Sequence, residues 1–550
     1  MSTNIELYKK LFNEKKFTEI IKKIETLEKV KSAQVLHILG ICKILQNKYD
    51  KNTKLSAREN FREAYLKEKN SNLGIEALSN FINISIDFLK IEDSLKYFEE
   101  VKKDFGNSLQ LLKAISRVYQ FSVRVEDRIK ILEKIIKLNP LEINDWCSYI
   151  YINNFDKKWD QKKFYSTAKE LSNNLENFNL QNIYIDKSIK NRKIKIAFLS
   201  ADICQGHSVA YFLEGLLKNL DRNKFHIIAI SNSNINDEKN NEFKCLFDNW
   251  YNIKLLNDLE ATKFIREKKI DIVFDIMGFT SENRITLFKN RIAPIQISWL
   301  GYCNTTGLEE MDYILSDKNL IFENEEKFYT EKIKNFKEVW NVHGGLEMER
   351  KKIELPALNK KFFTFGSFNN FNKISDDTLE TWSIILNSVK NSRLILKSSI
   401  KFDLESFTNR IKKANIFEKV EIIEKSTSFV SHLNQYNEID LALDTFPYNG
   451  VTTTFEALWK GVPVLTMNGY NFNSRCGSSI IKTLGIECLI AKNEKDYITN
   501  AISLATNKKK LKEIRDNIFD KVLKTSLFDT KKFAKNFEII IEEVVSEKLI

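Results

Sequence analysis

Residues 439–467 (IDLALDTFPYNGVTTTFEALWKGVPVLTM) combine residue types and spacings that could bind a phosphate group. A short apolar run leads into a loop rich in turn-forming residues, and three threonines follow at the expected start of a helix: Thr452, Thr453 and Thr454. The first amides of a helix lack partners within the helix and carry partial positive charge, and threonine hydroxyls add further donors. The pattern therefore predicts an anion site at this helix start. The simpler alternative is that the threonines only cap the helix.

Three further side chains near this stretch carry charge or can exchange protons. Lys373 follows a strand-like segment, FTFGSFNN, and its ammonium could neutralise a diphosphate leaving group. Glu456 lies in the first turn after the threonines, where it could bind ribose hydroxyls or simply favour the helix N-terminus. His432 lies on a predicted helix that leads into the strand before the loop. The alternatives are a solvated lysine and a histidine on a helix surface.

A second group of polar residues lies earlier in the chain. Ser200, Ala201 and Asp202 end a predicted strand, and His207 follows in the next loop, where it could exchange a proton near neutral pH. A structural loop histidine is the alternative. Residues 299–307 (WLGYCNTTG) form a loop of small and hydroxyl residues that could approach a sugar or phosphate closely.

Composition narrows the class of partner. The net charge of +12, from 86 basic and 74 acidic residues, is spread over many lysine-rich segments, so we expect attraction to anionic substrates and no nucleic-acid binding. Seven widely spaced cysteines form no CxxC pair, so the sequence predicts no zinc site and a reducing compartment. The sequence shows no other metal-ligand constellation, and no metal and no cofactor are expected. No signal-peptide pattern opens the chain, and no apolar run approaches the roughly 20 residues that span a bilayer. The predicted location is cytoplasmic, with no membrane partner.

Strand-like apolar runs alternate with helical stretches over most of the chain, which is the pattern of parallel, doubly wound sheets. The first predicted strands are 194–199, 225–230, 271–276, 293–300 and 311–315, and the second set is 362–368, 393–397, 420–423, 439–443, 462–467 and 488–491. Residues 323–360 are charged and irregular, and we interpret them as a hinge between the sets. A helix start of the capping-box type is predicted at Asp377 and Glu380. Ligands of such sheets bind at the carboxyl ends of the strands, where the polar loops described above fall.

Residues 1–185 show helical periodicity and almost no strand signal. A spacing of 34 residues recurs in two sets: Phe61, Leu95 and Ile129, and Ala64, Phe98 and Leu132. This spacing indicates a tetratricopeptide-like array, which would form a stacked-helix surface that grips a peptide or protein partner. A helical cap that only stabilises the neighbouring domain is the alternative.

Taken together, these segments resemble the O-GlcNAc transferase/SPINDLY family of protein glycosyltransferases. The resemblance covers roughly residues 194–545 and rests on SADICQGHS (200–208), APIQISWLGYCNTTG (293–307), MDYILSD (311–317), FTFGSFNNFNKIS (363–375), LDTFPYNGVTTTFEALWKGVP (443–463) and LIAKNEKDY (489–497). It implies a GT-B fold, in which two Rossmann-like domains face each other across a cleft, after an α-helical tetratricopeptide-like array. The domains it implies are 1–185 (helical), 193–345 (N-terminal Rossmann-like), 360–505 (C-terminal and nucleotide-sugar-binding) and 506–550 (closing helices).

The resemblance also implies a reaction and a role for each candidate side chain. The implied reaction is metal-independent, inverting transfer of GlcNAc or a related sugar from a nucleotide sugar to Ser or Thr of a protein that the helical repeats hold. Lys373, at the diphosphate, and His207, on the acceptor side where a proton must be relayed, would be catalytic. The implied donor-binding residues are Asn370, Lys373, His432, Thr452, Thr453, Thr454 and Glu456, with Glu456 near the ribose.

Local differences from the family pattern keep alternatives open. Val451 stands where O-GlcNAc transferases carry histidine, and the FGSFNN, NTTG and TTT segments are nearer to the SPINDLY branch, which uses GDP-fucose. UDP-GlcNAc is the expected donor, with GDP-fucose or a UDP-hexose as alternatives. His207 follows Asp202 by five residues where the family pattern has four. Two further readings are a non-catalytic helical-repeat adaptor with a decayed GT-B domain, and an epimerase or small-glycan transferase.

Overall fold

The computed structural model describes residues 2–28, 30–181, 189, 191–204, 206–233, 243–344, 346, 350–398, 401–424, 426 and 428–549. Contacts between residues divide the chain into two compact units. The first comprises Met1–Asp145 with Lys401–Asn409, and the second comprises Trp146–Ile400 with Arg410–Ile550. Each unit is considered by itself.

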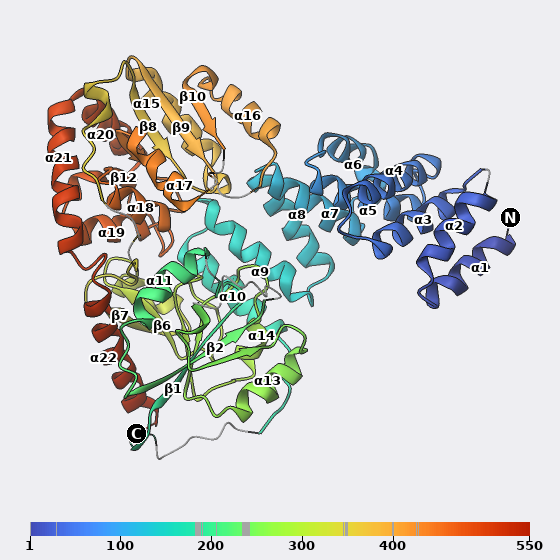
Figure 1. Ribbon diagram of the computed structural model, residues 1–550, viewed down its shortest axis with the longest axis horizontal. Helices are drawn as coiled ribbons and strands as arrows, with labels where there is room; N and C mark the ends of the chain where they lie inside the picture. The colour runs from blue at the N-terminus through green and yellow to red at the C-terminus, as the bar shows by residue number, and fades with distance from the viewer. Residues whose placement is uncertain are drawn as a thin grey trace. The chain divides into compact units, whose positions relative to one another are not determined.

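The first unit is an array of consecutive helices, drawn in blue tones in Figure 1. Its helices are α1 (Ser2–Asn13), α2 (Phe17–Leu27), α3 (Ala33–Gln46), α4 (Lys51–Lys67), α5 (Asn72–Asp87), α6 (Glu92–Phe105), α7 (Leu109–Phe121) and α8 (Val125–Leu138). Ser and Asp residues directly before α3, α4, α5 and α7 accept a hydrogen bond from the first turn, which fixes where these helices begin. Ala64, Phe98 and Leu132, which recur every 34 residues, are all buried, as expected for a repeating helical core.

The second unit begins within α9 (Ile143–Ile152), so the contact boundary differs from the predicted helical domain 1–185. The helical segments η1 (Asn153–Phe155) and α10 (Gln161–Asn174) precede the first sheet in sequence but belong with it by contact. Gln161 at the start of α10 donates its side-chain amide to Asn304 Oδ1 at 2.7 Å. This buried bond to the loop after β5 explains why α10 belongs to the second unit. Residues 182–188 and 190 of the predicted linker, 178–193, lie outside the described residues.

The first sheet of the second unit is entirely parallel, in the order β3-β2-β1-β4-β5-β6-β7. Its strands are β1 (Ile194–Ser200), β2 (Phe225–Ser231), β3 (Asn249–Asn252), β4 (Ile272–Asp275), β5 (Ile295–Ser298), β6 (Tyr313–Asp317) and β7 (Lys332–Phe336). The accompanying helices are α11 (Ser208–Leu217), α13 (Asp258–Glu267), α14 (Ile285–Lys289), η3 (Glu323–Phe328) and α22 (Thr530–Leu549). The order reverses between β1 and β4, which is the topological switch point of a doubly wound sheet.

Two strands of this sheet escaped the sequence-based prediction. β3 is short and polar, and β7 (KIKNF) carries lysines that alternate with apolar residues. Both are edge strands, where charged side chains protect the open edge, so neither shows the apolar run of an inner strand. The interpretation of 323–360 as irregular is therefore wrong for the part that forms η3 and β7.

The second sheet is also parallel, in the order β10-β9-β8-β11-β12-β13. Its strands are β8 (Phe363–Ser367), β9 (Ser392–Lys397), β10 (Val420–Ile423), β11 (Leu441–Leu443), β12 (Val464–Met467) and β13 (Ile490–Ala491). The longer helices around it are α15 (Asp376–Ser388), α16 (Leu404–Lys413), α17 (Phe429–Gln435), α18 (Thr452–Trp459), α19 (Cys476–Leu484), α20 (Glu494–Thr506) and α21 (Lys508–Lys521). Short 3₁₀ turns are η4 (Pro356–Leu358), η5 (Phe371–Lys373), η6 (Phe417–Lys419), η7 (Tyr436–Glu438), η8 (Glu487–Leu489) and η9 (Val522–Lys524).

The predicted capping-box start of α15 lies elsewhere than expected. The cap is Ser375, whose hydroxyl accepts from the amide of Thr378, so the helix begins before Asp377. A capping box does form at α13, between Asn257 and Glu260. Local sequence thus predicted the existence of α15 but not which polar residue caps it.

The last helix of the chain completes the first sheet. α22, dark red in Figure 1, contacts β5, β7 and α11. The ring of Phe537 lies 5.4 Å from that of Phe274 on β4, and Glu547 accepts a hydrogen bond from the hydroxyl of Tyr313 at 2.9 Å. The predicted closing helices, 506–550, therefore divide: α21 follows the second sheet and α22 returns to the first.

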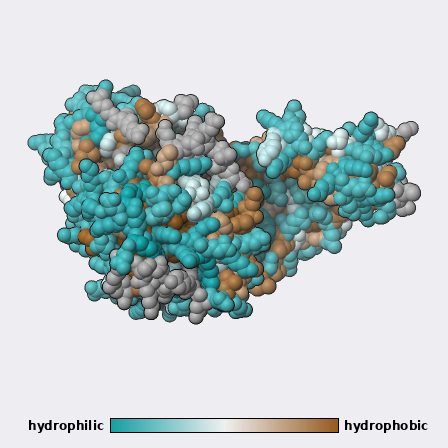
Figure 2. Space-filling model, turned by 60° about the horizontal axis from the view of Figure 1, so that its bottom comes forward, coloured by the Kyte–Doolittle hydropathy of each residue, from teal (hydrophilic) through white to brown (hydrophobic). Residues whose placement is uncertain are grey.

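The surface drawn in Figure 2 is mostly hydrophilic, with hydrophobic residues in separate, smaller groups. Large apolar side chains that are strongly exposed, such as Leu255 and Tyr49, are few compared with the buried core. Within the described part of the chain, no helix combines the length and the apolar character needed to cross a membrane. All seven cysteines are free thiols.

Candidate active site

Asp444, at the carboxyl end of β11, organises the loop that precedes α18. Its Oδ1 accepts hydrogen bonds from the amides of Gly450 at 2.7 Å and Thr445 at 2.9 Å, and its Oδ2 accepts from the Thr466 hydroxyl at 2.7 Å. Burial raises the pKa of this carboxyl to about 6, although the hydrogen bonds act in the opposite direction. One buried carboxylate therefore closes loop 444–450 on itself and fixes it to β12.

Lys373 places its ammonium on this loop. The side chain comes from η5, directly after β8, and its Nζ donates to the carbonyl of Asn449 at 2.8 Å. The same nitrogen lies 4.1 Å from the centre of the Tyr448 ring. Although part of the side chain reaches solvent, the surrounding protein lowers the pKa of Lys373 to about 8, and Asp444 counteracts this shift. The ammonium is thus held by the loop that Asp444 closes, through the Asn449 carbonyl and the Tyr448 ring.

The three threonines begin α18 but do not cap it. Val451 occupies the cap position and makes no side-chain hydrogen bond to the helix. The Thr453 hydroxyl donates to Asn369 Oδ1 at 3.0 Å, and the Thr454 hydroxyl donates to the carbonyl of Gly450 at 3.0 Å. Thr454 is buried, whereas Thr452 and Thr453 are half-buried. The Thr454 hydroxyl therefore ties the helix start to the loop, and the Thr453 hydroxyl ties it to the segment that follows β8. The first amides of α18 carry the partial positive charge of a helix N-terminus.

A small polar cavity lies beneath this helix start. Its volume is about 20 Å³, and its lining includes Asn369, Asp444, Thr453 and Tyr436. A cavity of this size accommodates a water molecule but not a nucleotide. The helix start therefore has a polar interior in addition to the surface that Lys373 and Thr452 border.

His432 on α17 is the centre of a buried network. Lys397 Nζ lies 2.8 Å from His432 Nδ1, and His432 Nε2 lies 3.0 Å from Glu456 Oε2, which also accepts from the Tyr436 hydroxyl at 2.9 Å. Because an ammonium can only donate, Nδ1 accepts and Nε2 carries the proton that is donated to Glu456. Both ring nitrogens are therefore occupied, and His432 can offer a ligand only the face or edge of its ring.

Glu456 lies deeper than its predicted ribose-binding role suggests. Its side chain is buried, and the contacts described above use Oε2 to hold His432 and Tyr436. Asn370, by contrast, shapes the turn that carries Lys373: its Oδ1 accepts from the amide of Asn372 at 2.9 Å and its carbonyl accepts from the amide of Lys373 at 2.8 Å. The structure thus places both residues as supports of other site residues.

His207 lies at the carboxyl end of the first sheet and caps α11. Its Nδ1 accepts from the amide of Val209 at 3.3 Å, and its Nε2 lies 3.7 Å from Asp202 Oδ1. The side chain is 41% exposed. Burial raises the pKa of Asp202, and the neighbouring imidazole counteracts the shift. The histidine is thus accessible to a substrate, but in this arrangement Nδ1 is used by the helix cap.

Helix α11 connects this histidine to the second sheet. The ring of Tyr211 stacks on that of Phe429 on α17 at 5.5 Å, and the ring of Phe212 meets Phe455 on α18 edge to face at 5.4 Å. The helix that begins at His207 therefore contacts both helices that carry predicted donor-binding residues. The other candidate residues lie on the second sheet, and His207 lies at the start of the first-sheet helix that contacts α17 and α18.

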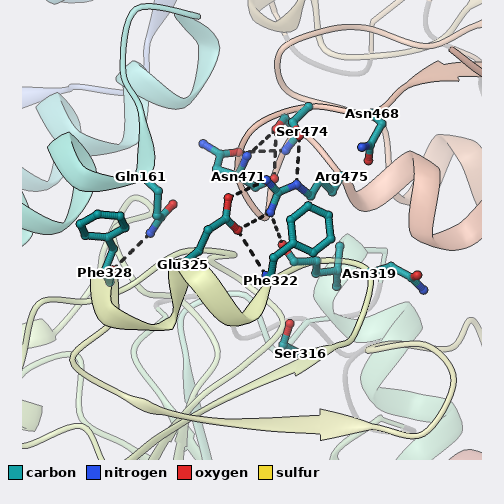
Figure 3. Close-up of polar contacts among 12 residues, drawn as sticks. Gln161, Ser316, Asn319, Phe322, Glu325, Phe328, Asn468, Asn471, Ser474 and Arg475 are labelled. Carbon is teal, nitrogen blue, oxygen red and sulfur yellow. Dashed lines mark hydrogen bonds and ion pairs between the residues drawn. The ribbon is translucent and has the colours of Figure 1, made fainter. Parts of the chain in front are cut away.

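A buried ion pair also joins the two sheets. Arg475, directly before α19, pairs with both carboxylate oxygens of Glu325 at 2.5 and 2.7 Å and donates to the carbonyl of Leu320 at 3.0 Å (Figure 3). The guanidinium lies 4.0 Å from the centre of the Phe322 ring. Arg475 is only 3% exposed. Glu325 belongs to the stretch interpreted as a hinge, so the beginning of that stretch is fixed to the second sheet and not free to flex.

Several residues of the site were not singled out from the sequence. They are Asn369, Asp444, Tyr448, Asn449, Lys397, Tyr436 and Tyr211. Asp444 could have been found, since an acid at the end of a buried strand before a turn-rich loop is a common support for that loop. The others depend on contacts between distant segments and gave no local signal. No group of three or more His, Cys, Asp or Glu side chains that could hold a metal ion occurs among the described residues.

The fold and the site define a class: two parallel α/β sheets of the GT-B type that follow an array of helical repeats. The model of glycosyl transferase family 41 matches residues 174–354 and 346–537, and the chain belongs to that family. The chain is similar to a solved mutant O-GlcNAc transferase from Thermobaculum terrenum, with a TM-score of 0.81 and 22% identity, over 94% of this chain and 99% of that one. Because the identity is only 22%, this similarity is evidence for the fold alone.

Two plant proteins are similar to part of this chain. A protein of Solanum lycopersicum, named probable UDP-N-acetylglucosamine–peptide N-acetylglucosaminyltransferase SPINDLY, is 31% identical over 417 residues, which are 74% of this chain and 44% of that protein. The SEC protein of Arabidopsis thaliana, with the same enzyme name, is 25% identical over 362 residues, 63% of this chain and 36% of its own length. The chain thus spans less than half the length of these relatives.

Proposed function

We propose that this chain is a glycosyltransferase that transfers a sugar from a nucleoside-diphosphate sugar to a Ser or Thr hydroxyl of a protein. Family membership supports the reaction class. The observation that carries the proposal is the Lys373 ammonium, held on the carbonyl of Asn449 beside the N-terminus of α18. A buried cation next to a helix start is arranged to bind a diphosphate.

In the proposed mechanism, the acceptor hydroxyl attacks the anomeric carbon from the face opposite the diphosphate, which inverts the configuration. The bond between that carbon and the β-phosphate oxygen breaks, and the negative charge that develops on the diphosphate is stabilised by Lys373 and the first amides of α18. These groups are in place before the substrate arrives, so little reorganisation is needed during the reaction. On this proposal no divalent cation takes part.

The hydroxyl must also lose a proton, and His207 is our candidate to position or accept it. Its Nδ1 accepts from the Val209 amide, and its Nε2 faces Asp202. Taking up a proton at Nδ1 would break the cap of α11, whereas orienting the hydroxyl through Nε2 would not. We therefore assign His207 chiefly a positioning role at the acceptor, and we assign the proton that the hydroxyl loses to the neighbouring carboxylate of Asp202.

The donor is proposed to be UDP-GlcNAc, since the relatives named above carry N-acetylglucosaminyltransferase names. GDP-fucose remains the second candidate, because the FGSFNN, NTTG and TTT segments are nearer to the SPINDLY-like pattern, and a UDP-hexose is the third. Both ring nitrogens of His432 are already hydrogen-bonded, so only the face or edge of its ring can contact a nucleobase. His432 therefore does not by itself distinguish uracil from guanine. The protein acceptor is proposed to bind the helical repeats of the first unit.

The test incubates the full chain separately with UDP-GlcNAc, UDP-glucose and GDP-fucose and measures the release of UDP or GDP, with calorimetry of UDP and GDP binding alongside. We expect slow hydrolysis of one donor and binding of its nucleotide. Binding of neither nucleotide would overturn the proposal in favour of the adaptor. Conversion of UDP-GlcNAc to an epimer without transfer would instead support an epimerase.

A further inference from the structure

The Tyr448 ring lies between a cation and a second aromatic ring. Lys373 Nζ lies 4.1 Å from its centre, and the ring of Phe155 stacks on Tyr448 with centres 5.1 Å apart and planes 17° apart. Phe155 belongs to η1, in the helical segment that precedes the first sheet. Three segments that are far apart in the sequence thus meet in one stack at the site.

The stack is held firmly on each side. The carbonyl of Tyr448 accepts from the Thr445 hydroxyl at 2.8 Å, which fixes its backbone in the loop that Asp444 closes. Phe155 is buried and meets Tyr151 edge to face at 5.6 Å. Neither ring can move without disturbing buried neighbours, so Tyr448 presents a fixed face to the ammonium.

We propose that Tyr448 is a positioning residue that holds Lys373 as a charged ammonium at the diphosphate subsite, and that Phe155 supports the ring from behind. The negative face of an aromatic ring attracts a cation, so the ring favours the charged amine and fixes its direction. One hydrogen of the ammonium is donated to the Asn449 carbonyl and the Tyr448 ring lies against the same nitrogen, so two contacts fix the position of the amine. The link to donor binding rests on the proposed function.

The Tyr448 ring opposes the effect of burial on the Lys373 amine, because burial disfavours the charged form and the ring favours it. Burial lowers the pKa of Lys373, while Asp444 and, more weakly, the thiols of Cys476 and Cys303 act to raise it. These are the titratable groups that face Lys373, together with Tyr448 itself. Replacing the ring by an aliphatic side chain keeps the apolar surroundings and removes the attraction, so the pKa of Lys373 should fall further.

The test measures this pKa directly, without any nucleotide. Competitive acylation of the full chain across pH 6–10, followed by peptide mass spectrometry, gives the pKa of Lys373, with the exposed Lys137 as internal standard. We expect Tyr448→Leu to lower it by about half a unit or more, and Tyr448→Phe to leave it unchanged, because phenylalanine keeps the ring face. Phe155→Leu should lower it less, and Tyr470→Leu, the same change at a tyrosine whose hydroxyl donates to the backbone carbonyl of Asp156, should leave it unchanged.

Nucleotide binding then connects the ring to the site. UDP and GDP binding by calorimetry should weaken about fivefold or more in Tyr448→Leu and by less than twofold in Tyr448→Phe, for the nucleotide that the unaltered chain binds. The inference is overturned if the leucine and phenylalanine variants behave alike, or if neither Tyr448→Leu nor Phe155→Leu changes the pKa of Lys373. If the unaltered chain binds neither nucleotide while the pKa responds as expected, the proposed function fails and the role of Tyr448 stands.

Discussion

The carboxyl ends of the two sheets are built differently. At the second sheet, Asp444, Lys373 and Thr454 are tied by short hydrogen bonds to one loop, and most of the groups involved are buried. At the first sheet, His207 is 41% exposed and makes one bond to its own helix and a long contact to Asp202. The same type of fold therefore supports a rigid site at one sheet and an open one at the other.

This difference fits the two halves of the proposed reaction. A leaving diphosphate has fixed geometry and charge, so groups that stabilise it gain most from being held in place beforehand. An acceptor segment of a protein must enter and leave, which requires a more exposed surface. The ion pair of Arg475 and Glu325 joins the two sheets, so the proposed reaction does not require a large closing motion of one sheet toward the other.

The largest expected effect comes from removing the cation of the rigid site. Lys373→Met keeps the aliphatic stem and should lower donor turnover about 10³-fold, because stabilisation of the leaving diphosphate is lost. The rate at which the active donor releases its nucleotide, UDP or GDP, measures this loss of turnover. Lys460→Met, a change at the buried lysine at the far end of α18, is the matched control and should retain turnover. Normal turnover of a folded Lys373→Met variant would break the comparison.

A smaller effect concerns the pH dependence of stability. Burial raises the pKa of Asp444 to about 6 in the folded protein, above the value near 3.9 of an unfolded chain. The folded state therefore binds this proton more tightly, and the contribution to stability is full below about pH 4 and is lost as the pH rises through 6. The difference between the folded and unfolded pKa of Asp444 corresponds to about 3 kcal/mol in the free energy of unfolding.

Asp444→Asn should accordingly make the melting temperature less dependent on pH between 4 and 7, whatever its constant cost in lost hydrogen bonds. The comparison variant is Asp202→Asn at the open site, whose carboxyl is 27% exposed and whose pKa is also raised by burial. We expect a smaller change there, because solvent screens this carboxyl. If Asp202→Asn altered the pH dependence of the melting temperature more than Asp444→Asn does, the ranking of the two carboxyls would be reversed.

The smallest expected effect is at His207. Asparagine is a favourable N-cap residue, so His207→Asn keeps an acceptor for the Val209 amide while removing the imidazole. Transfer to a protein acceptor should fall about tenfold, with nucleotide binding and melting temperature unchanged. His207→Ala, which also loses the cap, should cost about 1 kcal/mol of stability in addition. Full transfer by His207→Asn would reduce the histidine to a helix cap.

The sequence was a good guide wherever the signal is local. The inner strands appear where apolar runs were found: the run at 194–199 forms β1 and the run at 393–397 forms β9. Strands buried on both faces need continuous apolar residues, and this requirement is visible in a single segment. The edge strands β3 and β7 lack it, because an edge is protected by polar and charged side chains.

For the site, residue types and order along the chain placed Lys373, His207 and Thr452–Thr454 at the ends of strands, because parallel sheets collect such loops at one edge. The partners of these residues were decided only by tertiary structure. Glu456 is buried under His432 and Tyr436, and Tyr448 lies between Lys373 and Phe155 from a distant helical segment. A sequence pattern records which side chains a segment offers, whereas the packing of separate segments determines what each side chain touches and how much water it keeps.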